Sequence, residues 1–107
     1  MLKKENRAEK KEIDLLFKEG KFLNSTNLTF KFILTSQNSK KISFIAPKSV
    51  AKLAVKRNLL RRHGYNALGK YLDQFPTGIL GVFIFKKYQT DVLIIENEIK
   101  NILNKIN

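Results

Sequence analysis

Residues 79–85 read Ile-Leu-Gly-Val-Phe-Ile-Phe. Gly81 has no side chain, and all the other side chains in this run are apolar. Phe75-Pro76-Thr77-Gly78 stands directly before it and has the composition of a turn. A short, continuous apolar run beside a turn is typical of a strand that is buried on both faces. We therefore predict a central strand over residues 79–85, which other elements must cover on both sides.

Helical patterns flank this strand. On its C-terminal side, Thr90 to Ile106 places apolar residues at helical spacing, beginning with Leu93 or Ile94 and continuing with Ile95, Ile99, Ile102, Leu103 and Ile106. On its N-terminal side, no proline interrupts Val50 to Asp73, where one side of a helix would carry Leu53, Leu60, Ala67, Leu68 and Tyr71. Gly64 and Gly69 each weaken this helix by about 1 kcal/mol relative to alanine, so we expect its second half to be bent or loosely held.

Two strands and another helix are predicted nearer the N-terminus. From Leu28 to Thr35 the sequence alternates, with one face made of Leu28, Phe30, Phe32 and Leu34. Lys41 to Ala46 forms the next strand, which Pro47 ends, and the turn residues 36–39 between the two make a hairpin the simplest pairing. Glu5 to Gly20 fits an amphipathic helix with an apolar side of Ile13, Leu16 and Phe17.

The order helix, strand, strand, long helix, strand, helix is that of an α+β sandwich around one small sheet. With 107 residues, 43% of them hydrophobic, the chain can bury one core, so residues 1–107 are expected to form a single domain. There is no cysteine, and no run approaches the ~18 consecutive apolar residues of a membrane span. We expect no disulfide, no thiolate metal site and no membrane partner, and the cytoplasm is the expected compartment.

Positive charge is concentrated in the middle of the chain. There are 21 lysines and arginines against 9 acidic residues, and the segment from Gly20 to Leu72 holds eleven basic residues and no acidic one. A solvated helix normally mixes both signs to gain ion pairs, and a helix lying on an anionic membrane would need the apolar residues that the core requires. The pattern therefore favours a nucleic-acid partner over these two alternatives.

The long helix carries residue types that contact RNA. A face roughly opposite its apolar side would hold Ala54, Arg57, Asn58, Arg61 and Tyr65. Arginine binds phosphate through two parallel hydrogen bonds, asparagine can donate and accept at a 2′-hydroxyl, and alanine lets a backbone come close. Three lysines before and beside this face would add phosphate contacts without reading sequence, namely Lys48, Lys52 and Lys56.

The string AVKRNLLRR at residues 54–62 is preceded by PKSVAKL and by the strand KISFIA. In this setting it resembles the signature R-N-x-x-[KR]-R of the protein subunit of bacterial ribonuclease P, and the resemblance covers nearly the whole chain. Near the start, that family has an arginine, two phenylalanines four residues apart and a glycine, which correspond here to Arg7, Ile13, Phe17 and Gly20.

The resemblance implies a ribonuclease P protein-like fold, similar to the second domain of ribosomal protein S5, with a mostly antiparallel central sheet of about four strands and three helices. It implies a basic cofactor for a catalytic RNA, which together form a ribonucleoprotein endoribonuclease that removes the 5′ leader from precursor tRNA. The RNA supplies the active site and holds Mg²⁺, and the protein holds no metal. The implied partners are the catalytic RNA and precursor tRNA, with no small-molecule substrate.

The resemblance also assigns residues to two sites. The family's motif residues lie beside the RNA active site, and they correspond to Arg57, Asn58, Arg61 and Arg62. With the helix residues already named, the predicted RNA-binding set is Lys48, Lys52, Lys56, Arg57, Asn58, Arg61, Arg62 and Tyr65. In the family, aromatics of the first helix and the sheet line a cleft for the single-stranded leader, and the corresponding set is Arg7, Ile13, Phe17 and Lys31.

The sequence departs from the family pattern in three ways. Tyr65 and Asn66 stand where most members have an Arg-Glu pair, so a phosphate contact is lost or replaced by stacking. Ile13 replaces a phenylalanine and removes one stacking surface. Lys31 stands where a strand aromatic is common, although a shift of one residue would bring Phe30 or Phe32 there. Phe17 itself is either the stacking aromatic of the cleft or an ordinary core residue.

Catalysis by the protein alone has little support in the sequence. His63 is the single histidine, and the close acidic pair Glu9 and Glu12 lies among lysines. Two other functions stay open at this point. One is a small ribosomal or other structured-RNA-binding protein with no role in cleavage, and the other is an independent nuclease.

Overall fold

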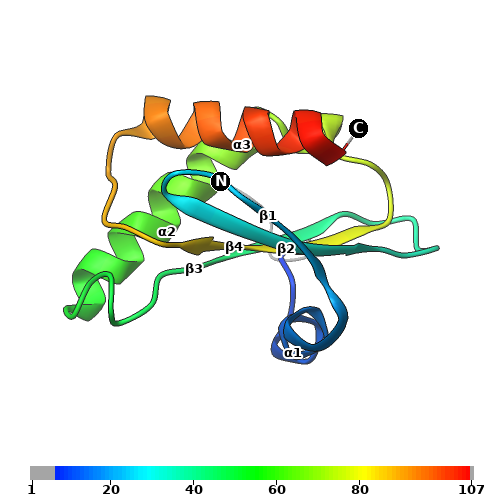
Figure 1. Ribbon diagram of the computed structural model, residues 1–107, viewed down its shortest axis with the longest axis horizontal. Helices are drawn as coiled ribbons and strands as arrows, with labels where there is room; N and C mark the ends of the chain where they lie inside the picture. Colours follow the sequence, from blue (N-terminus) through cyan, green and yellow to red (C-terminus); the bar gives the residue numbers. More distant parts are fainter. Residues whose placement is uncertain (1–6, 107) are drawn as a thin grey trace.

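The computed structural model describes residues 7–106, which form an α+β fold of three α-helices and one four-stranded mixed sheet (Figure 1). The elements in chain order are α1 (Lys10–Glu19), β1 (Lys21–Asn24), β2 (Leu28–Leu34), β3 (Lys41–Ile45), α2 (Ala54–Gly69), the 3-10 helix η2 (Leu72–Gln74), β4 (Ile79–Phe85) and α3 (Val92–Ile106). The predicted fold class is confirmed. None of the helices within residues 7–106 is long and apolar enough to cross a membrane.

The strand order is β1-β2-β4-β3, with β2 antiparallel to both β1 and β4 and β3 parallel to β4. The predicted hairpin between β2 and β3 is wrong, because β4 lies between these strands. Because β4 carries apolar side chains on both faces, an interior position in the sheet buries more of its apolar surface than an edge position would. A parallel partner also needs a long crossover, and α2 provides it between β3 and β4.

The sheet separates two layers (Figure 1). α2 and α3 cover one face, where the large core contains stacked rings of Phe30 and Phe83 with centroids 4.2 Å apart, and of Phe44 and Phe83 at 5.0 Å. α1 covers the other face through a smaller cluster of Leu16, Leu80 and Val82. This smaller cluster covers only part of this side of the sheet, which we call the α1 face of the sheet.

β1 was not predicted from the sequence. Its four residues pair only with β2, and most of its side chains are exposed, including Phe22. An edge strand with little buried surface has no clear apolar alternation, so periodicity does not reveal it. Its pairing follows from the neighbouring β2.

A buried carboxylate fixes the turn between β1 and β2. Glu98 of α3 accepts hydrogen bonds from the backbone N–H of Asn27 at 2.7 Å, from the Asn27 side-chain amide at 2.5 Å and from the Ser25 hydroxyl. Charge-assisted bonds of this kind are stronger than neutral ones. The turn is therefore tied to α3, which holds β1 in register.

α1 is shorter than the predicted helix from Glu5 to Gly20. It begins at Lys10, after a capping box in which the Glu12 carboxylate accepts a bond from the Glu9 N–H at 2.9 Å. It ends where predicted, since the Gly20 N–H donates to the Leu16 carbonyl at 2.8 Å. The first two residues of the predicted helix lie outside the described residues.

α2 is also shorter than predicted. The N–H groups of Val50 and Ala51 both donate to the Pro47 carbonyl, so this segment is a turn and the helix begins at Ala54. Leu53 is 59% exposed and does not belong to the buried side, which contradicts its predicted place in the apolar stripe. The apolar residues farther along, Leu60, Ala67 and Leu68, are buried as predicted.

Gly64 lets the second half of α2 pack closely on the sheet, where the sequence predicted a bent or loosely held segment. A Cβ atom at this position would lie 2.4 Å from the Phe44 ring. The missing side chain therefore lets α2 pack closely on β3, and the helix runs without interruption from Ala54 to Gly69.

α3 follows its prediction except at its start. Leu93 is 67% exposed and Ile94 is exposed as well, whereas the rest of the apolar stripe packs on the core. Lys70 at the end of α2 pairs with Glu96 of α3 at 2.7 Å. The hydrogen bond from this ammonium to the Glu96 carboxylate raises the pKa of Lys70.

Candidate nucleic-acid interface

Arg57 holds the loop that enters α2. Its guanidinium Nη1 donates to the Ala51 carbonyl at 2.9 Å and to the Lys52 carbonyl at 2.7 Å, and the side chain is half-buried. The sequence predicted a phosphate contact at this position. The structure adds a positioning role, because the same side chain orders the backbone that carries Lys52.

A pocket of about 260 Å³ lies beside α2, lined by Arg7, Asn58, Arg61, Arg62 and Tyr65. We call it the arginine pocket. The Arg61 guanidinium donates to the Asn58 carboxamide oxygen, which joins two of the predicted RNA-binding side chains on successive turns. The described lining contains no carboxylate, and the ion pairs within residues 7–106, Lys41 with Glu12 and Lys70 with Glu96, do not involve Arg61 or Arg62.

Tyr65 does not lie on the exposed face where the helical wheel placed it. It is only 7% exposed, its hydroxyl accepts a bond from the Phe44 N–H at 3.2 Å, and its ring packs edge-on against Phe44. The prediction failed because β3 is an edge strand whose outward N–H needs a partner, and Tyr65 supplies it. The Arg7 guanidinium lies over the Tyr65 ring, 4.4 Å from its centroid. Tyr65 is thus a wall of the arginine pocket and part of the core.

The three predicted lysines are exposed and stand outside the arginine pocket. Lys48 and Lys52 lie in the loop before α2. Lys56 is near the start of the helix, with its ammonium 5.7 Å from the centroid of the Tyr88 ring. The three lysines are therefore free to meet a polyanion around the start of α2 without sharing the pocket.

The strand registers place a row of side chains across the α1 face of the sheet. Ile45 of β3 pairs with Ile84 of β4, Ile84 pairs with Thr29 of β2, and Thr29 pairs with Asn24 of β1. All four are at least partly exposed. We call this set the cross-sheet row. It starts at edge strand β3, whose Phe44 binds Tyr65 of the arginine pocket, and ends at edge strand β1.

Phe17 and Lys31 lie beside this row. Phe17 is 48% exposed, and the Lys31 ammonium lies 4.7 Å from the centroid of its ring. The core interpretation of Phe17 is therefore wrong. A shift that would bring Phe30 or Phe32 to this face is also excluded, because both rings are buried in the core under α2 and α3.

Ile13, the remaining predicted cleft residue, is half-buried on α1. Arg7 lies in the arginine pocket, apart from Phe17 and Lys31. The structure thus separates Arg7 from Phe17 and Lys31, which contact each other. The row residues themselves were not predicted, since only the strand registers bring them together.

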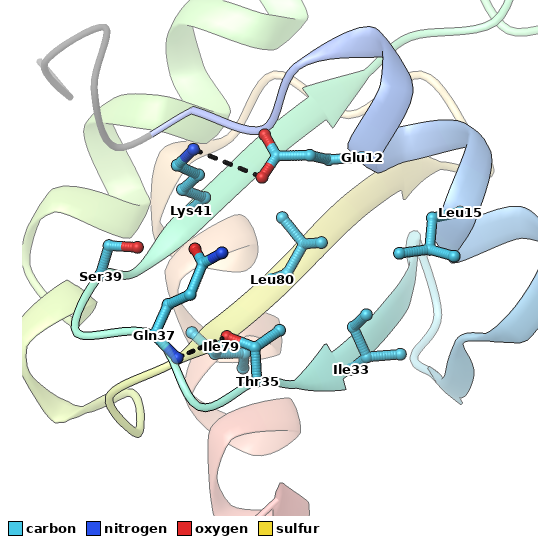
Figure 2. Close-up of a pocket in the computed structure, with 9 residues that line it drawn as sticks. All are labelled: Glu12, Leu15, Ile33, Thr35, Gln37, Ser39, Lys41, Ile79 and Leu80. Carbon is cyan, nitrogen blue, oxygen red and sulfur yellow. Dashed lines mark hydrogen bonds and ion pairs between the residues drawn. The ribbon is translucent and has the colours of Figure 1, made fainter.

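A second pocket lies against α1, next to Glu12 and Leu15 (Figure 2). This pocket of about 220 Å³ is lined by Glu12, Leu15, Ile33, Thr35, Gln37, Ser39, Lys41, Ile79 and Leu80. Its one lysine is paired with Glu12 at 3.4 Å, and its described lining has no aromatic ring. A carboxylate and the lack of a stacking surface make it a poorer place for a single-stranded polyanion than the Phe17 side.

His63 lies away from the arginine pocket. Its Nδ1 is 2.9 Å from the Thr90 carbonyl oxygen, so the ring contacts the connection between β4 and α3. A carbonyl accepts, so this nitrogen carries the proton. His63 therefore links α2 to the connection between β4 and α3.

Comparison with known proteins identifies relatives of this fold. The family model described as ribonuclease P matches residues 1–107. The chain is similar to the RNase P protein from Thermotoga maritima, with a TM-score of 0.82 and 21% identity over 94% of this chain and 97% of that one. It is also similar to the Staphylococcus aureus RNase P protein, with a TM-score of 0.80 and 13% identity over 98% and 97%. No curated protein sequence matches it.

The family match excludes one of the two other functions that the sequence left open. At these identities the solved structures establish the fold, and the match over the whole chain establishes the family. A structured-RNA-binding protein with no link to tRNA processing is thereby excluded, and the partner class is RNA. The chain belongs to the ribonuclease P protein family, and it is the protein subunit of the enzyme that processes the 5′ end of tRNA.

Proposed function

We propose that this chain binds the catalytic RNA of ribonuclease P through the basic side chains of α2 and holds the 5′ leader of precursor tRNA along the cross-sheet row. The observation that carries the proposal is the arrangement of that row, with arginines at one end and Phe17 with Lys31 beside it. Phosphates are attracted by the guanidinium and ammonium groups, and unpaired bases stack on the exposed ring.

The proposed RNA-binding set is the predicted one, with two roles changed. Lys48, Lys52 and Arg62 are exposed and positioned for phosphates, whereas Arg57 also orders the entering loop. Tyr65 contributes through the pocket wall that it forms with Arg7. The proposed leader residues are Phe17 and Lys31, which border the row, Arg7 at the pocket end, and Ile13 of α1.

Magnesium is assigned to the RNA in this proposal. Mg²⁺ takes oxygen ligands, mainly carboxylates and phosphates, and no carboxylate lines the described part of the arginine pocket. Its guanidinium groups favour phosphate and disfavour a free cation. The phosphates of the catalytic RNA would therefore hold the Mg²⁺ that the reaction uses, with the Asn58 carboxamide at most nearby.

Reconstitution tests the proposal. The protein with its cognate catalytic RNA should cleave precursor tRNA faster at low Mg²⁺ than the RNA alone, because the bound protein holds the leader and neutralises phosphates that Mg²⁺ would otherwise screen. The protein without RNA should not cleave. Equal rates with and without protein would contradict the proposed role, and cleavage by the protein alone would support an independent nuclease.

A further inference from the structure

Phe22 is an exposed aromatic residue that the sequence did not single out. It lies on β1, at the edge of the sheet, and 62% of its surface is exposed. An exposed aromatic ring offers a surface on which an unpaired base can stack.

The strand register places Phe22 next to the Phe17 and Lys31 pair. Phe22 is the direct partner of Lys31 across β1 and β2, so the two side chains point to the same face of the sheet, with Cβ atoms about 5 Å apart. The Lys31 ammonium in turn lies 4.7 Å from the centroid of the Phe17 ring. We call Phe17, Lys31 and Phe22 the edge platform.

The platform is held in a fixed shape. Glu98 ties the turn between β1 and β2 to α3 through its bonds to Ser25 and Asn27, and Gly20 ends α1 immediately before β1. A binding surface that is already ordered loses less conformational entropy when a ligand binds. The strand that carries Phe22 is therefore already ordered before a ligand binds.

We propose that Phe22 forms a second stacking site for single-stranded RNA, and that it takes a leader nucleotide farther from the cleavage site than the one on Phe17. The inference rests on the proposed function, which places the leader along the cross-sheet row. The arginine pocket adjoins β3 and Phe22 lies on β1, so the two are at opposite edges of the sheet. Lys31 between the two rings would contact the intervening phosphate.

Affinity measured as a function of leader length tests this site. Reconstituted holoenzyme would be titrated with precursor tRNAs whose leaders grow by one nucleotide at a time. F22A should match the unmodified protein for short leaders and bind about 5-fold or more weakly once the leader reaches the second ring. F17A should lose affinity at shorter leader lengths, F22W should restore the long-leader affinity, and L93A, which removes an exposed apolar side chain from α3, should behave as unmodified.

The outcomes separate the two proposals. If F17A loses leader affinity while F22A matches the unmodified protein at every length, the Phe22 site is wrong and the proposed function stands. If the unmodified protein gains no affinity from any leader, both are wrong. A loss in F22A that is equal for mature tRNA and for every leader length would show a structural role only and would also overturn the inference.

Discussion

Replacing Arg61 and Arg62 together with alanine should weaken binding of the catalytic RNA about 40-fold at 0.1 M salt, and the loss should shrink as salt increases. Both side chains line the arginine pocket, and neither has a recorded carboxylate partner within residues 7–106. Each phosphate contact contributes roughly 0.7 to 0.9 to the slope of log affinity against log salt. The slope of the double variant should therefore be lower by roughly 1.4 to 1.8, as measured by fluorescence anisotropy over a salt series.

The matched control removes two charges elsewhere. Lys100 and Lys105 are exposed on α3, which covers the opposite face of the sheet from α1 (Figure 1). K100A/K105A should leave the slope nearly unchanged. An equal loss of slope in both double variants would mean that net charge alone acts, and no loss in R61A/R62A would contradict the assigned interface. R57A is a less specific test, because it also releases the loop at Ala51 and Lys52.

Replacing Phe17 with alanine should remove most of the preference for precursor over mature tRNA. Stacking of one base on an aromatic ring contributes roughly 1–3 kcal/mol, so the affinity for precursor should fall about 5- to 150-fold while the affinity for mature tRNA stays constant. Because 48% of the side chain is exposed, the change should lower the melting temperature only slightly. Competition between precursor and mature tRNA for the holoenzyme measures the preference directly.

Leu15 offers the comparison on the same helix. It lines the pocket that contains the Glu12 and Lys41 pair (Figure 2) and is exposed to a similar degree. L15A should keep the preference for precursor, and F17W should keep it as well because the indole ring also stacks. A preference lost in L15A and retained in F17A would place the leader in the pocket of Figure 2 instead.

Local patterns predicted the elements that bury their side chains regularly. The apolar run of β4, the alternation of β2 and the stripe of α3 all appear in the structure. The strand order did not follow from the sequence, because pairing of β3 with β4 depends on contacts across the α2 crossover. β1 escaped detection because its side chains are mostly exposed and its pairing depends on β2.

The candidate site was also predicted only in part from the sequence. Charge and the arginine and asparagine spacing located the basic side chains of α2, whereas the helical wheel misplaced Tyr65, since it could not include the unpaired N–H of the β3 edge. The resemblance assigned Lys31 and Phe17 to one cleft, and in the structure the Lys31 ammonium lies 4.7 Å from the centroid of the Phe17 ring. Ile45, Ile84 and Thr29 carry no sequence signal of their own and meet only through the strand registers.

Cross-linking would test the placement of the leader most directly. A photoreactive phenylalanine analogue would be introduced in place of Phe17 in one protein and in place of Leu15 in another, and each would be assembled with the catalytic RNA and a labelled precursor tRNA. The account predicts cross-links from position 17 to nucleotides of the 5′ leader and none to the leader from position 15. Leader cross-links from position 15 with none from position 17 would contradict it.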